Sequence, residues 1–141
     1  RSRHYLSASK YFFSRIDVIL EGEGKQDFKN LPINVFMPQG PLFFGSIEPL
    51  ISAYADALKH EILIVDMSHV TMIDLSGAYA LEDLIKGAEA SNIKVLVSNA
   101  MPKIKKVLEK VNFIKHIGEN HYTDSKSSII RIISEHYRLE A

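Results

Sequence analysis

The side chains best placed for chemistry lie in one short segment, Asp74-Leu75-Ser76-Gly77. A helix is expected to begin here, and the N–H groups of a first helical turn have no partner within the helix. With the positive end of the helix dipole, they could hold an anion, a nucleotide phosphate or an acidic side chain. Ser76 could also carry a phosphate, which a helix N-terminus favours. We favour a simpler role for Ser76 as the helix N-cap, for which Asp74 competes.

Residues for catalysis or metal binding follow no recognised pattern. The sequence has no cysteine, which excludes disulfides, thiol catalysis and cysteine-ligated zinc. Asp66 and Asp74 could pair as two carboxylates, but a strand end and a helix cap explain them better. The histidines lack metal-ligand spacing and lie at positions 4, 60, 69, 116, 121 and 136. We therefore predict that the chain is not an enzyme and uses no metal or cofactor.

A strand and a helix must hold the Asp74 to Gly77 segment in place. The apolar run Ile62-Leu63-Ile64-Val65 is too short for a membrane span and has no one-sided alternation, so it predicts a strand buried on both faces. After the segment, apolar residues recur at helical spacing, which predicts a helix with the stripe Ala78, Leu81, Leu84, Ile85 and Ala88.

The folded domain is expected to begin at Leu31, with a hairpin. Ile33–Met37 alternates as a strand, residues 38–41 form a turn, and a second apolar run, residues 42–44, is closed by Gly45. Ser46 would then cap a helix whose buried stripe is Ile47, Leu50, Ile51, Tyr54 and Leu58.

The second half of the chain continues the alternation of strand and helix. Residues 93–97 predict a strand, and a helix follows from Pro102. Its apolar face is Ile104, Val107, Leu108 and Val111, and its other face carries a lysine row that we interpret as solvated, namely Lys103, Lys105, Lys106 and Lys110. Phe113, Ile114 and Ile117 should pack as the chain crosses to a last helix, which opens at Asp124 or Ser125 and buries Ile129, Ile130, Ile133 and Tyr137.

These elements predict an α/β fold. We expect a mostly parallel sheet of four to five strands, with a hairpin at its start and about four to five covering helices. The length of 141 residues fits one domain with a real core. The 17 basic and 17 acidic residues cancel, so no global field recruits nucleic acid and none is expected as a partner. No apolar run approaches the roughly 18 residues of a membrane span, so we expect a soluble, intracellular segment.

Residues 1–30 form a leader and linker of different character. The first fifteen residues carry four cations and no acid, interleaved with aromatic rings. That composition suits a segment just inside a membrane, or equally a plain amphipathic helix or strand packed on the domain.

The stretch from Ile73 to Gly77 resembles the signature loop of STAS domains. In the anti-sigma-factor antagonists of that family the loop is typically Asp-Ser-Ser-Gly or Asp-Ser-Thr-Gly, and its first hydroxyl residue is phosphorylated. Asp74, Ser76 and Gly77 match this pattern, whereas Leu75 occupies the phosphorylated position. Leucine cannot accept a phosphate, so this chain departs from the family at its regulated residue.

A second motif is similar to the cytoplasmic C-terminal STAS domain of SulP-type anion permeases. It is Gly40-Pro41-Leu42-Phe43-Phe44-Gly45, and the resemblance covers about residues 31–137. It implies a STAS-like fold and a non-catalytic regulatory domain below a secondary transporter of sulfate or a related anion. It also implies a place at the cytoplasmic face of the plasma membrane. The implied partners are the transmembrane domain of the parent permease, a second copy in a homodimer, and a soluble protein or nucleotide at the Asp74 loop.

Two other functions remain open. The chain could be a free-standing anti-sigma-factor antagonist that binds a kinase partner under control of phosphorylation. It could also be a light- or nucleotide-sensing STAS module within a larger signalling protein. Leu75, the Gly40 to Gly45 motif and the basic leader favour the permease domain over the antagonist.

Overall fold

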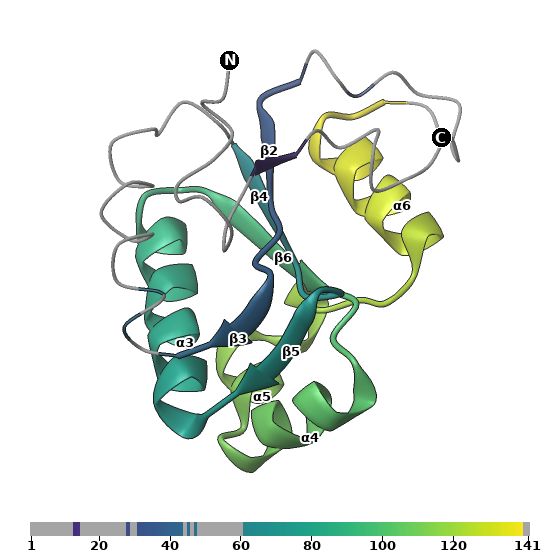
Figure 1. Ribbon diagram of the computed structural model, residues 1–141. Helices are drawn as coiled ribbons and strands as arrows, with labels where there is room; N and C mark the ends of the chain where they lie inside the picture. Colours follow the sequence, from purple (N-terminus) through teal and green to yellow (C-terminus); the bar gives the residue numbers. More distant parts are fainter. Residues whose placement is uncertain are drawn as a thin grey trace.

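The computed structural model describes residues 13–14, 28, 31–43, 45, 47 and 61–139. Strands alternate with helices, as predicted (Figure 1). The elements in order are β1 (Phe13–Ser14), β2 (Ile33–Phe36), β3 (Gly40–Leu42), β4 (Ile62–Asp66), β5 (Val70–Ile73), α3 (Leu75–Ala90), β6 (Lys94–Ser98), α4 (Pro102–Lys110), α5 (Phe113–Ile117), the 3-10 turn η2 (Glu119–His121) and α6 (Lys126–His136).

The larger sheet has four strands in the order β1-β2-β4-β6. Strand β1 pairs antiparallel with β2, and the pairs β2–β4 and β4–β6 are parallel. Every residue of β4 is buried, as its uninterrupted apolar sequence predicts for a central parallel strand. The α/β fold with mostly parallel strands is therefore confirmed.

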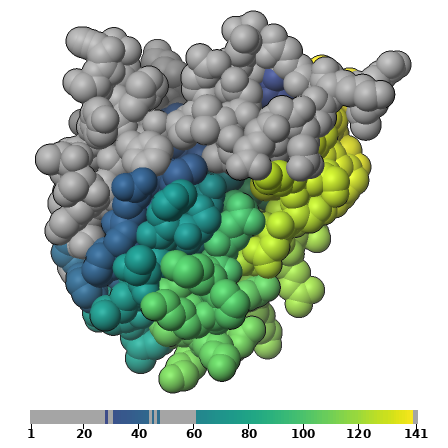
Figure 2. Space-filling view, turned by 45° about the vertical axis from the view of Figure 1, so that its right-hand side comes forward, coloured from purple at the N-terminus to yellow at the C-terminus, as the bar shows by residue number. Residues whose placement is uncertain are grey.

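The predicted hairpin between residues 33–37 and 42–44 is wrong. Strand β2 already has a partner on each edge, β1 and β4, so it has no free edge for β3. Instead β3 forms a separate two-stranded parallel sheet with β5, a strand that the sequence pattern did not separate from β4. Strand β3 follows β2 in the chain and β5 follows β4, so the small sheet lies beyond the carboxyl ends of β2 and β4 (Figure 1). Its two strands lie side by side at the surface in Figure 2.

Helices cover both faces of the larger sheet. On one face, Leu63 and Val65 of β4 pack in a cluster with α3, α4 and α5. On the other face, Ile62 and Ile64 pack in a second cluster with Ile129 and Ile133 of α6. Because alternate residues of a strand point to opposite faces, one short apolar strand supplies both cores.

The later elements match the sequence closely. Helix α4 begins at Pro102 and buries Ile104 and Leu108, and α6 begins after an N-cap at Ser125 and buries Ile129 and Ile133. Gly45 and Ile47 are helical, but the rest of the helix predicted after Ser46 lies outside the described residues, as does most of the leader. Within the described part of the chain, no helix has the length and apolarity needed to cross a membrane.

Candidate functional site

Asp74 organises the start of α3. It is the N-cap residue, with an extended backbone, and its Oδ1 accepts a hydrogen bond of 2.7 Å from the backbone N–H of Gly77. The capping role that we assigned to Ser76 is therefore wrong, because Ser76 already lies in the first helical turn. Ser76 is exposed, as are Asp74 and Leu75, and its hydroxyl does not cap the helix.

The structure brings the two sequence motifs together. Strand β3 carries the first motif and pairs with β5, so that Leu42 lies opposite Ile73, directly before the second motif. Gly77 lies against the backbone oxygen of Leu42, and an added Cβ would overlap that atom. The Gly40 to Gly45 motif thus supports the Asp74 loop from the side. Phe44 of this motif lies outside the described residues.

Four large apolar side chains surround this loop and remain exposed. We call Phe43, Met72, Leu75 and Tyr79 the loop patch. Their exposed fractions are 39%, 52%, 49% and 50%, and they account for four of the five exposed large hydrophobic side chains in the described residues. Leu75 and Tyr79 are one turn apart on α3, so they share a face. Large apolar side chains exposed in one region make the loop patch a candidate interaction surface.

The other candidate residues have structural roles. Asp66 ends β4, where its Oδ1 accepts a 2.9 Å hydrogen bond from the Ser68 N–H, while Asp74 lies beyond the end of the next strand. Among the described residues, no group of three histidine or acidic side chains could hold a metal ion.

A polar cluster ties the loop after β6 to the start of α6. The Tyr122 hydroxyl donates to Asp124 at 2.6 Å and accepts from the Ala100 N–H at 3.1 Å. Lys105 approaches Asp124 at 3.1 Å and lies 4.8 Å above the Tyr122 ring, so it departs from the solvated lysine row predicted for this helix. Burial and the bond to Asp124 raise the pKa of Tyr122, which keeps the phenol neutral.

This cluster should make stability depend on pH in the acid range. Burial tends to raise the pKa of Asp124, but the hydrogen bonds from Tyr122, Lys105 and the Asn99 N–H outweigh it and lower that pKa below its ordinary value. A lowered folded-state pKa stabilises the fold above the unfolded value of about 3.9, and this stabilisation is lost as pH falls through the folded value. In chemical unfolding between pH 7 and 3, the stability gap between wild type and Asp124→Asn should therefore narrow below about pH 4. Asp83→Asn, at an exposed aspartate of α3, is the matched control and should not show this narrowing. A stability gap between wild type and Asp124→Asn that stays constant with pH would contradict the expectation.

Two glutamate–histidine pairs, which the sequence reading missed, join α3 to the segment after α4. Glu82 is buried, and its Oε2 lies 2.7 Å from His116 Nδ1; Glu89 Oε2 lies 3.1 Å from His121 Nε2. The available signal was the position of Glu82 next to Leu81 and Ile85 in the apolar stripe. A charged residue there needs a partner.

The chain is similar to known proteins in sequence and in fold. The sequence profile described as STAS domain matches residues 25–128. Sulfate transporter 1.1 of Arabidopsis thaliana is 36% identical over 59 residues, 42% of this chain and 9% of that protein. The chain covers no more than about a fifth of the length of such relatives, between 9% and 21%.

Solved structures share the fold. The SulP transporter STAS domain from Vibrio cholerae superposes with a TM-score of 0.68 at 24% identity, over 86% of this chain and 96% of that one. The anti-sigma factor antagonist SpoIIAA in its unphosphorylated form gives a TM-score of 0.61 at 15% identity, over 83% of this chain and 98% of that one.

Proposed function

Since this chain belongs to the STAS domain family, we propose that it is the non-catalytic regulatory domain of a SulP-type secondary transporter of sulfate or a related anion. Its relatives by sequence include a sulfate transporter of which it spans only a small part. In this proposal residues 31–141 form the STAS domain on the cytoplasmic side of the membrane, and residues 1–30 are the connection towards the membrane domain.

The loop patch is the observation that carries a regulatory role. Leu75 places an apolar side chain, half exposed, at the helix N-terminus where the family motif has a phosphorylated hydroxyl residue. Leu75, Phe43, Met72 and Tyr79 together form an apolar surface. Because leucine cannot be phosphorylated, no phosphate can be added to this surface at position 75. A protein surface that covers the patch removes these side chains from water, at about 25 cal/mol for each Å² of apolar area.

The mechanism follows from differential binding. A partner that covers the loop patch in one arrangement of domain and transporter, but not in another, shifts the equilibrium between the two. The partner is the transmembrane domain itself or a soluble protein. The domain neither carries the anion nor needs to bind it.

The test places two aspartates in the patch of the intact transporter. Leu75→Asp with Tyr79→Asp should change sulfate uptake several-fold per transporter in the membrane. Leu75 lies in the first turn of α3, where an acidic residue is favourable for the helix. Uptake is counted per transporter in the membrane, so a variant that fails to fold is recognised by its low amount there. Leu139→Asp, at an exposed leucine beyond α6, is the matched control. Uptake equal to wild type in the double variant would refute the loop patch as a control surface.

A second candidate function is a phosphorylation switch of the anti-sigma antagonist type. It is favoured by the exposure of Ser76, whose hydroxyl does not cap the helix because Asp74 is the N-cap residue. Incubation with a candidate kinase, followed by mass spectrometry, should then show one added phosphate on Ser76, which a Ser76→Ala variant would lack. An unmodified Ser76 would leave the transporter domain as the better proposal.

A further inference from the structure

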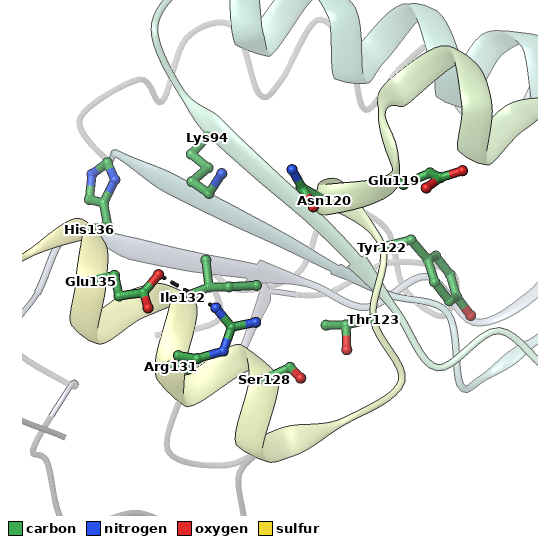
Figure 3. Close-up of a pocket in the computed structure, with 10 residues that line it drawn as sticks. All are labelled: Lys94, Glu119, Asn120, Tyr122, Thr123, Ser128, Arg131, Ile132, Glu135 and His136. Carbon is green, nitrogen blue, oxygen red and sulfur yellow. Dashed lines mark hydrogen bonds and ion pairs between the residues drawn. The ribbon is translucent and has the colours of Figure 1, made fainter.

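A polar cleft of about 610 Å³ lies between β6, η2 and α6 (Figure 3). That volume is within the range of about 300 to 1,000 Å³ typical of small-molecule sites. None of its lining residues belongs to the loop patch, and α6 packs on the sheet face opposite to α3. We call it the α6 cleft; it is lined by Lys94, Glu119, Asn120, Tyr122, Thr123, Ser128, Arg131, Ile132, Glu135 and His136.

Two cations in the α6 cleft are available to a ligand. The Lys94 side chain makes no hydrogen bond or ion pair within the described residues, and it extends from β6 while Arg131 extends from α6 (Figure 3). The ion pair of Arg131 with Glu135 is long, at 3.5 Å, and both side chains are exposed. Exposed pairs one helical turn apart are weak, so an anionic ligand can compete for this guanidinium.

Neutral donors and carboxylates complete the lining. Asn120 and the Ser128 hydroxyl make no side-chain hydrogen bond in the described part of the structure. Thr123 Oγ1 accepts from the Ser125 N–H, which leaves its own hydrogen free to donate. Glu119 can accept hydrogen bonds at the rim. Donors and acceptors side by side suit a ligand with hydroxyl groups, because a hydroxyl both donates and accepts.

We propose that the α6 cleft binds a small polyhydroxylated organic anion. Its phosphate or carboxylate head lies between Lys94 and Arg131, and its hydroxyls meet Asn120, Ser128 and Glu119. An inorganic ion would fill only a small part of the cleft, and the nearby carboxylates would repel a second anionic group. The assignment goes beyond the proposed function and does not depend on it, since it uses no residue of the loop.

The test is a titration of the isotope-labelled 141-residue chain, followed by amide NMR shifts. The two probes are glucose 6-phosphate, which has a phosphate head, and gluconate, which has a carboxylate head. The two control compounds are glucose, which lacks the anionic head, and inorganic phosphate, which lacks the polyhydroxylated carbon chain. Binding of either probe, with shifts at Lys94, Asn120, Ser128 and Arg131, supports the proposal and identifies the head group. Binding of glucose or of inorganic phosphate as tight as that of the probes overturns it. The absence of shifts for both probes at a probe concentration of about 10 mM also overturns it, because a dissociation constant above that concentration is too weak for a specific small-molecule site.

Variants then assign the head group to the two cations. Lys94→Ala and Arg131→Gln should each weaken binding of the effective probe about tenfold, the loss expected for one charged hydrogen bond. Lys106→Ala removes an exposed lysine of α4 outside the cleft and should leave the affinity unchanged. Unaltered affinity in both cleft variants, with wild-type thermal unfolding, would overturn the proposed contacts.

Discussion

Gly77→Ala is expected to lower the free energy of unfolding by about 2 to 3 kcal/mol, the upper part of the range for overpacking a tightly filled position. A Cβ at this position would overlap the backbone oxygen of Leu42 and come within 3.0 Å of Asp74 Oδ1. The first neighbour is main chain of β3 and cannot rotate away. The second is the capping oxygen, so the variant also disturbs the bond that begins α3.

Gly87 offers a matched control on the same helix. A Cβ at Gly87 would meet nothing within 4 Å, so Gly87→Ala should raise stability by up to about 1 kcal/mol through the better helix propensity of alanine. Denaturant unfolding of the two variants should therefore move the midpoint in opposite directions. If Gly77→Ala instead stabilised the chain as Gly87→Ala does, the close approach of β3 to the loop would be refuted.

Much of the fold is predictable because its elements carry their own periodicity. The spacing of Ile104 and Leu108 predicts the buried face of α4, and Ile129 and Ile133 do the same for α6. The uninterrupted apolar run of β4 likewise predicts its central place. Each of these features is local in sequence, and each is confirmed.

Strand pairing is not local, which explains the wrong hairpin. Residues 33–37 and 40–45 look like two strands and a turn, and nothing in them reveals that β1 and β4 occupy both edges of β2. Nor does the sequence reveal that Val70–Ile73 forms a separate strand, β5, which becomes the partner of β3. The pairing depends on residues about 30 positions apart, and no local pattern encodes it.

The candidate site was predictable in composition but not in arrangement. Asp74 and Ser76 both carry oxygens that can cap a helix, and the backbone conformation decides for Asp74. The loop patch had a readable signal, because Leu75 and Tyr79 fall outside the apolar stripe of α3 yet share one face. Only the pairing of β3 with β5 places Phe43 and Met72 in the same region.

His116→Ala is expected to lower the free energy of unfolding by about 1 to 3 kcal/mol, the cost of leaving a buried charged group without a good partner. The side chain of Glu82 is 8% exposed, whereas that of His116 is 42% exposed. Removal of the imidazole takes away the 2.7 Å contact and leaves Lys86, at 3.8 Å, as the remaining ion-pair partner of Glu82 in the described residues. The loss should appear in denaturant unfolding at neutral pH.

A double-mutant cycle separates this pair from simple loss of packing. Glu82→Gln replaces the carboxylate with a neutral amide that costs less to bury. Glu82→Gln should therefore lower stability less in the His116→Ala background than in the wild-type background. His69→Ala, at an exposed histidine on the surface turn before β5, should change stability by no more than about 0.5 kcal/mol. Additive losses in the cycle would contradict the pairing. A coupling of about 0.5 to 3 kcal/mol would instead mean that Glu82 holds α5 against α3 by a polar contact, on the same helix whose first turn carries the loop patch.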